Sequence, residues 1–240
     1  MDRPRRLPYA QSVDSSTGSG PERLASGRHG LPRAYVASSQ RERLREAMVR
    51  VAAEKGYAAT TITEVVEAAG VSSATFYELF DDKESCFLEA FAAVNDVVVA
   101  HVSAAYLAAD GEPWPQRIAA ALRAMVELLS AEADIARLTM VEGTAAGDSA
   151  RRIYGRALAR FAPFLEEGRE YAGQNDDLPA DTARFAIGAA TSMIFDEIRA
   201  GRGADLERIL PDLVFAVLMP YLGPADAEAE MRRVAAESEE

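Results

Sequence analysis

The sequence predicts an all-α fold. Apolar residues recur at helical intervals from residue 38 onward, glycines separate the helical segments, and no segment alternates apolar and polar residues as a strand does. Hydrophobic residues make up 49% of the chain and charged residues 27%, which is typical of a soluble globular protein. We therefore expect a flexible basic arm at 1–37, a helical region from residue 38 onward and an acidic, frayed tail at 223–240.

The net charge of −12 is unevenly distributed along the chain. Residues 1–50 hold ten arginines and five acidic residues, whereas the rest of the chain holds 16 basic and 33 acidic residues. A basic arm on an acidic body is compatible with binding to nucleic acid, because phosphates attract the arm and repel only the body. The same composition is compatible with a disordered tail that contacts nothing.

The composition also indicates a compartment. Cys86 is the only cysteine, which excludes an internal disulfide and fits a reducing cytoplasm. No apolar run approaches the ~20 residues that span a bilayer. No apolar stretch follows the basic N-terminus as it would in a signal peptide. We expect a cytoplasmic protein without a membrane segment.

Two capping boxes mark the first two helices. Ser39 with Glu42 has the spacing of a helix start, and Thr61 with Glu64 repeats that spacing before the second helix. Gly70 stops the second helix, because glycine adopts the left-handed conformation of a helix end without a steric penalty. With Ser72 or Ser73 as the next N-cap and Asp81-Asp82 as a further boundary, the expected helices are 38–55, 62–69, 74–80 and 83–108.

Breaks rich in glycine or aspartate separate the remaining helices, which carry apolar residues at helical spacing. Beyond Gly111 the expected spans are 114–131, 134–145, 149–172, 180–200 and 205–222.

The segment 60–83 has the pattern of a helix-turn-helix at about 61–81. Its two short helices are joined by a tight turn at Gly70, and their apolar residues form a small core that fixes the crossing angle. Small side chains at the start of the second helix would let it enter a major groove deeply. On spacing alone, a helical corner that contacts no DNA is an equally good interpretation. The expected core is Val65, Val66, Val71, Phe76 and Phe80, and the open face is Ser72, Ser73, Ala74, Thr75 and Tyr77.

This region resembles the DNA-binding domain of the TetR family of transcriptional regulators over about residues 38–91. The shared residues are dense and in order over about fifty positions, which favours DNA binding over the helical corner. They are Gly56-Tyr57, Thr60-Thr61, Ala69-Gly70-Val71-Ser72, Thr75-Phe76-Tyr77, Phe80, Asp82-Lys83-Glu84 and Phe87. The resemblance implies an N-terminal three-helix helix-turn-helix DNA-binding domain at 38–95, followed by a helical ligand-binding and dimerisation bundle at 96–222.

The resemblance also implies roles for single residues. Thr61, Tyr77 and Lys83 would contact phosphates, and Ser72, Ser73, Ala74 and Thr75 would lie on the recognition helix. Two positions depart from the family pattern: many relatives carry a basic residue where this chain has Ser73, and a histidine or tyrosine where it has Leu79. Base preference is therefore open.

The arm offers a further DNA contact. Arg28 and Arg33 flank a Gly-Leu-Pro stretch and could place an arginine in an adjacent minor groove, as the arms of some helix-turn-helix proteins do. An arm without any contact is an equally good interpretation.

The resemblance implies that 96–222 holds an effector pocket. Large, flexible apolar side chains suit a hydrophobic ligand, although each is also ordinary core material. The candidate pocket residues are Met125, Leu129, Met140, Phe161, Phe164, Met193 and Phe195.

The last two expected helices are candidates for a dimer contact, since a two-fold dimer suits palindromic DNA. Their apolar residues recur at helical spacing, and intramolecular packing would produce the same pattern. The candidate dimer residues are Ile187, Ala190, Ile194, Leu210, Val214, Val217, Leu218 and Tyr221.

Catalytic and metal sites find little support in the sequence. His29 and His101 form no metal-ligand motif, Cys86 lies among apolar residues, and no glycine-rich phosphate loop follows a strand. We expect no enzyme, no cofactor and no metal.

The expected function is a repressor that leaves a palindromic operator when a small, hydrophobic effector binds. Its partners would be duplex operator DNA, a second copy and that unidentified effector.

The alternative is a TetR-like helical dimer that acts through protein partners without binding DNA. The excess of acidic over basic residues in the chain favours this alternative, as does the absence of a basic residue at Ser73. The retention of Thr61, Tyr77 and Lys83 opposes it.

Overall fold

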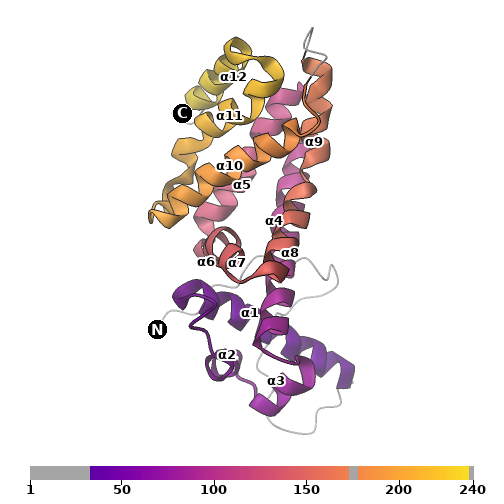
Figure 1. Cartoon of the computed structure of the whole chain (residues 1–240), viewed down its shortest axis with the longest axis vertical. Helices are drawn as coiled ribbons and strands as arrows, with labels where there is room; N and C mark the ends of the chain where they lie inside the picture. The colour runs from indigo at the N-terminus through magenta and orange to yellow at the C-terminus, as the bar shows by residue number, and fades with distance from the viewer. Residues whose placement is uncertain (1–32, 173–177, 238–240) are drawn as a thin grey trace. The chain divides into compact units, whose positions relative to one another are not determined.

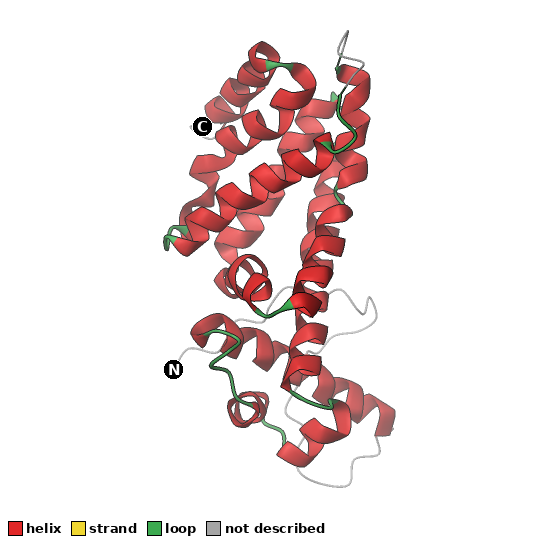
Figure 2. Cartoon of the chain, viewed as in Figure 1, coloured by secondary structure: helices red, strands yellow, loops and turns green. Residues whose placement is uncertain are grey.

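A computed structural model of the chain describes residues 33–172 and 178–237, and all regular structure in these ranges is helical (Figures 1 and 2). The predicted all-α fold class is confirmed. The chain divides into two units, the first ending at Val97 and the second beginning at Val98.

The first unit is a three-helix core closed by the start of a fourth helix. Its elements are α1 (Arg33–Lys55), α2 (Ile62–Ala69), α3 (Ser73–Leu79) and α4 (Lys83–Ala108), of which the part up to Val97 belongs to this unit. Each helix turns its apolar side inward, as the period of 3.6 residues requires. The fully buried core side chains include Leu44, Met48, Val65, Phe76, Phe87 and Phe91.

The start of α1 differs from the expectation. The helix begins at Arg33, so the capping-box spacing of Ser39 and Glu42 lies inside it and marks no N-terminus. The residues from 33 to 55 contain neither proline nor glycine, and nothing in them interrupts a helix. The predicted arm of 1–37 is therefore shorter by the five residues that join α1. Arg28 lies outside the described residues.

The second unit packs several helices around α5 (Trp114–Ala131) and α11 (Leu210–Leu222). α5 buries eight of its 18 residues and α11 six of its 13, and the two helices contact each other. The other elements are α6 (Ala133–Arg137), η2 (Leu138–Glu142), α7 (Gly143–Ala145), α8 (Asp148–Ala159), α9 (Ala162–Glu166), η3 (Glu167–Tyr171), α10 (Thr182–Arg199), η4 (Gly203–Ile209) and α12 (Pro224–Glu237).

Two expected long helices are interrupted. The span 149–172 breaks after α8, because Pro163 lacks an N–H and is tolerated only in the first turn of a new helix, α9. The span 205–222 starts as the 3₁₀ segment η4, whose backbone at Asp205 is not helical, and Pro211 then opens α11. In 134–145 the chain stays helical but widens to a π-helix at η2.

The acidic C-terminal segment is folded, which corrects the expectation of a frayed tail at 223–240. Pro224–Glu237 forms α12, which packs against α11, and Figure 1 shows the two as neighbouring yellow helices. Ala227 and Val234 are fully buried in this contact, and Arg233 pairs with Glu230 and Glu237 along the outer side. Composition alone did not indicate this helix, of which only Ala227 and Val234 are buried.

α4 is long and apolar enough to cross a membrane by length and composition, unlike the other helices of the described ranges. A core helix of a folded protein has the same properties. Within the second unit α4 buries Val98, Val102 and Tyr106 against protein, which accounts for its composition.

Candidate nucleic-acid interface

The turn between α2 and α3 has the predicted geometry. Thr61 is the N-cap of α2, and its capping box with Glu64 is complete: the Glu64 carboxylate accepts from the Thr61 amide at 3.0 Å and hydroxyl at 2.6 Å. Gly70 ends the helix at φ 64°, ψ 39°, where a side chain would be strained. Val71 donates its N–H to the carbonyl of Val66 at 3.1 Å, which completes the turn.

α3 is short and presents its N-terminal side to solvent. Ser72 is its N-cap, with Oγ accepting the Thr75 N–H at 3.1 Å and lying 3.0 Å from the Thr75 hydroxyl. Phe76 is fully buried and holds the helix against the core, whereas the neighbouring Tyr77 is 60% exposed. Ser72, Ser73 and Ala74 are exposed and Thr75 is half-buried, so the structure brings the predicted open face together. In the predicted core, Val71 is half-buried and the other four residues are buried.

The arginines of α1 face the ends of the other helices. Arg41 donates to the carbonyl of Leu79 at 2.7 Å, at the end of α3, and pairs with Glu89 of α4 at 2.6 Å. Arg50 donates to the carbonyl of Ala68 at 3.3 Å, at the end of α2. Cations are stabilising at helix C-termini, where carbonyls lack intrahelical partners. These side chains hold α2 and α3 on α1.

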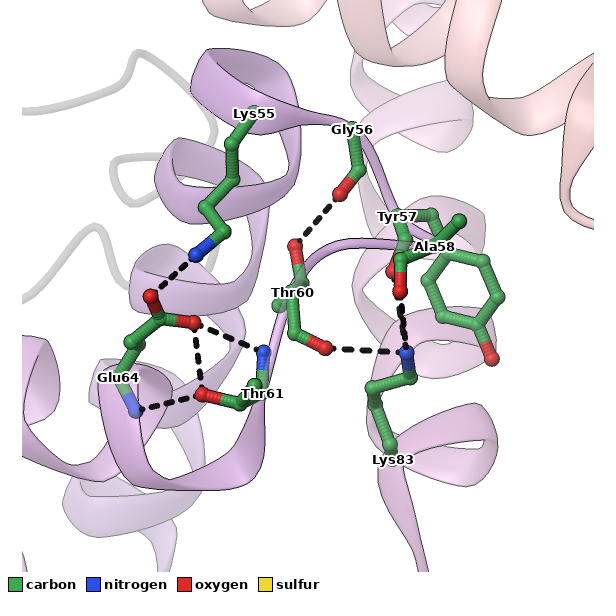
Figure 3. A network of polar contacts seen from close by, with 8 residues as sticks. All are labelled: Lys55, Gly56, Tyr57, Ala58, Thr60, Thr61, Glu64 and Lys83. Atoms are coloured by element: carbon green, nitrogen blue, oxygen red, sulfur yellow. Dashed lines mark hydrogen bonds and ion pairs between the residues drawn. The ribbon is translucent and has the colours of Figure 1, made fainter.

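The Lys55 ammonium pairs with the carboxylate of Glu64, next to the capping box (Figure 3). Lys55 and the Thr61 hydroxyl and amide together hold the pKa of Glu64 at about 2. The carboxylate is thereby charged throughout the neutral range and fixed at the start of α2.

Lys83, at the first position of α4, also turns inward. Its ammonium donates to the carbonyls of Thr60 at 3.0 Å and Tyr57 at 3.1 Å, lies 3.5 Å from that of Ala58, and sits 4.5 Å from the centre of the Tyr57 ring (Figure 3). The expected contact of Lys83 with phosphate therefore competes with these partners. Sequence reasoning missed them because they lie 23 to 26 residues away in the chain.

Residues 44–90, which include α2, α3 and Lys83, match the family model described as bacterial regulatory proteins, tetR family. This segment carries the TetR-family domain. The resemblance seen in the sequence over 38–91 is confirmed in this range.

Solved TetR-type regulators share the fold well beyond that domain. The fatty acid degradation regulator FadR of Bacillus halodurans has a TM-score of 0.65 at 20% identity, covering 75% of this chain and 94% of its own. FadR of Bacillus subtilis, solved in complex with stearoyl-CoA, has a TM-score of 0.65 at 18% identity, covering 76% of this chain and 98% of its own. TylP of Streptomyces fradiae has a TM-score of 0.59 at 20% identity, covering 87% of this chain and 100% of its own. A comparison with curated protein sequences finds no match. Identities this low establish the fold alone.

The described part of the TetR-type unit is acidic. Residues 33–97 hold seven basic and eleven acidic side chains. Arg41, Arg45, Arg50, Lys55 and Lys83 all have partners within the unit. A duplex approaching this unit would meet few cations that are not already engaged.

The predicted pocket residues are spread over several elements of the second unit. Leu129 and Met140 are buried, and the Tyr154 hydroxyl, which sequence reasoning missed, lies 3.4 Å from the sulfur of Met140. Burial raises the pKa of Tyr154 to about 12. Phe164 stacks on Tyr106, with ring centres 4.3 Å apart. The partly exposed members are Met125, Phe161, Phe164, Met193 and Phe195.

The predicted dimer residues pack mainly within the chain. Ile187 is half-buried, and Ala190, Ile194, Leu210, Val214, Val217, Leu218 and Tyr221 are buried in a single copy. Their dimer role stays a prediction, because one chain does not test it, but their side chains already have neighbours. The opposite side of α10 exposes Phe185 at 66% of its surface, along with Gly188, Ala189 and Ser192. The sequence analysis did not single out this exposed side. The signal that could have found it is that apolar residues of α10 occur on both sides of the helix.

Groups suited to other chemistry are few in the described ranges. No cluster of three His, Cys, Asp or Glu side chains there could hold a metal ion. Cys86 is buried, and burial, with the nearby Glu89 carboxylate, raises the pKa of its thiol to about 12. A thiol of that kind is a packing residue rather than a nucleophile.

Proposed function

We propose that this chain is a ligand-responsive transcriptional regulator that binds duplex operator DNA through α3. The observation that carries the proposal is the exposed N-terminal side of α3 within a TetR-type domain. Ser72, Ser73 and Ala74 are small enough for close approach to base edges in a major groove. Tyr77 of α3 and Thr61 at the start of α2 are also exposed and would contact phosphates.

The arm preceding α1 would supply the missing positive charge. The described cations of the unit are largely engaged, whereas residues 1–32 contain five arginines, Arg28 among them, and three acidic residues. Arg33 stands at the start of α1. Arginines in a neighbouring minor groove would add phosphate neutralisation and a narrow-groove contact.

The second unit would bind a small, hydrophobic effector. The π-helix η2 supports this, because such local widenings are frequent at functional sites, and it carries the pocket candidate Met140 against Tyr154. The complex of Bacillus subtilis FadR with stearoyl-CoA makes long-chain acyl-CoAs suitable first probes.

A homodimer in the cytoplasm would place two recognition helices on a palindromic operator. The exposed side of α10 around Phe185 supports self-association, since exposed apolar helix faces are uncommon on monomers. We expect effector binding to change the separation of the two recognition helices, so that both half-sites are no longer engaged and the operator is released. Repression relieved by ligand follows from this sequence of events.

DNA selected by the full-length protein from a random duplex library tests the proposal. We expect a palindromic site, bound more weakly at 200 mM than at 50 mM salt and more weakly still with an active acyl-CoA. The acidic charge of the TetR-type unit favours a second candidate, a dimer that acts through protein partners only. No enrichment and no mobility shift at 50 mM salt would contradict the DNA-binding proposal and favour that candidate.

A further inference from the structure

The ammonium of Lys83 is a three-donor group surrounded by carbonyl oxygens. It lies 3.0, 3.1 and 3.5 Å from the carbonyls of Thr60, Tyr57 and Ala58, and above the face of the Tyr57 ring (Figure 3). An ammonium has three N–H donors and no more. All of them have acceptors inside the unit.

The two ends of this contact bracket the helix-turn-helix. Thr60 directly precedes the N-cap of α2, and Lys83 follows the short connection that ends α3. The bonds therefore join the chain just before α2 to the chain just after α3. The Tyr57 ring also packs on Phe87, with centres 4.3 Å apart, so the loop is held by apolar contact on the same helix, α4.

We propose that Lys83 is a positioning residue that clasps the two ends of the α2–α3 pair, and not a phosphate contact. The inference rests on the proposed function of α3 in DNA binding. A phosphate could recruit the ammonium only by releasing these carbonyls, and of the three only that of Tyr57 has a further donor in the turn, the Thr60 N–H at 3.2 Å. The clasp instead fixes the direction from which α3 meets the groove.

Lysine suits this position for a geometric reason. Its ammonium is compact and directs three donors to acceptors around it, whereas the guanidinium of arginine is a flat fork matched to paired oxygens such as those of phosphate. Lys83→Arg therefore keeps the charge that a phosphate contact needs but loses the fit that a clasp needs. Lys83→Met removes the charge and keeps the length.

The experiment measures binding of wild type, Lys83→Met and Lys83→Arg to the selected operator and to random duplex at several salt concentrations. Lys55→Met is the matched control, because Lys55 is a second lysine of the same unit whose ammonium pairs with Glu64 outside the clasp. Active protein is titrated in each preparation, so that unfolded material does not count as weak binding.

We expect both Lys83 variants to lower the ratio of operator to random-DNA affinity by about tenfold or more, because a misplaced α3 impairs base recognition first. We expect the slope of log affinity against log salt to stay as in wild type. A direct phosphate role for Lys83 predicts the opposite pattern: the slope becomes shallower by about 0.9 per phosphate neutralised, or about 1.8 in a dimer. Operator and random DNA would then weaken equally.

Two outcomes overturn the proposal: wild-type affinity in Lys83→Arg together with a shallower slope in Lys83→Met, or an unchanged specificity ratio in both. A second readout needs no DNA. Amide hydrogen exchange over 57–60 should accelerate in free Lys83→Met and not in Lys55→Met, whose own partner Glu64 bonds the Thr61 amide outside this window, and equal protection in both would also overturn the clasp. If wild type binds no DNA, the proposed function fails while this exchange measurement still tests the clasp.

Discussion

The indole of Trp114 covers Gly168 so closely that a Cβ atom on that glycine would stand 2.3 Å from ring carbon Cζ2. The indole N–H donates to the carbonyl of Phe164 at 2.7 Å, and the ring meets Tyr221 edge-on at 5.2 Å. Trp114 is thus held by α9, η3 and α11 at once. Its position between two prolines does not show whether this side chain lies at the surface or packs inside, and the structure buries it fully.

Gly168→Ala should therefore destabilise the second unit, because neither the rigid indole nor the 3₁₀ backbone can yield easily. Overpacking of this kind costs about 1–3 kcal/mol. Gly155→Ala is the matched control, since its Cβ would meet nothing within 4 Å in the middle of α8 and should be neutral or stabilising by up to about 1 kcal/mol. Urea unfolding followed by the single tryptophan measures both. Equal stability of the two variants would contradict the close approach of the indole to Gly168.

Removal of the Tyr77 hydroxyl should weaken DNA binding without changing the preferred sequence. The ring is 60% exposed and packs edge-on against buried Phe76, so Tyr77→Phe keeps the fold of α3. Under the proposed function, the variant would lose one hydroxyl–phosphate hydrogen bond per subunit, and we expect the affinity for operator and random DNA to fall alike, by about tenfold. Fluorescence anisotropy with both duplexes is the measurement. Unaltered affinity would remove Tyr77 from the interface.

Cys86 should be inert in the folded protein. Its pKa of about 12 lies three units above the ordinary thiol value of 9.0, which lowers the thiolate fraction near pH 8 about a thousandfold. Burial blocks reagents as well. Iodoacetamide at pH 8 should leave native protein unmodified over hours and should alkylate it within minutes in guanidinium, as read by intact mass. Rapid native labelling would show that α4 opens readily.

The Glu64 carboxylate should contribute to acid sensitivity only below pH 4.5. Its pKa is lowered from 4.5 to about 2, so the folded state favours the charged form. The stabilisation is complete above the unfolded pKa and is lost as the pH falls from about 4.5 toward 2. Glu64→Gln should therefore flatten the decline of stability in this window and leave the shape of the pH 5–8 profile unaffected. A parallel decline in both proteins would show that the capping box is not formed in solution.

Self-association should depend on the exposed side of α10. Phe185→Asp places a charge on that side without touching the buried one, and should shift a dimer to monomer in light scattering at micromolar concentration. Leu107→Asp is the control, because Leu107 is 59% exposed on another helix, α4. Dimers that persist in Phe185→Asp would show that the dimer interface lies elsewhere.

The sequence was most informative where local chemistry decides the structure. Thr61, Gly70 and Ser72 fix helix ends within their own turn, and each has the predicted cap geometry. Helix-period patterns likewise placed α5 at its observed bounds. Such features depend on neighbours a few positions away, which a single sequence contains in full.

Prediction was weaker where distant residues decide the structure. The carbonyls that bind the Lys83 ammonium precede α2 in the chain, whereas Lys83 follows α3. The sequence therefore does not reveal that this cation has partners in the fold. Candidate dimer residues such as Leu210 and Val217 could be recognised as apolar, but periodicity does not say which neighbour covers them. Pro163 is a local signal for the break before α9, which the helical periodicity on both sides of it conceals.

The packing of α12 on α11 changes how the protein should be shortened. Cutting after Leu222 looks harmless on composition, yet it would strip the cover formed by Ala227 and Val234 from the most apolar helix of the second unit. It would also remove Glu237, which pairs with Arg123 of α5 at 2.8 Å. A version trimmed there should precipitate on expression, whereas one ending just beyond Glu237 keeps the apolar surface shielded.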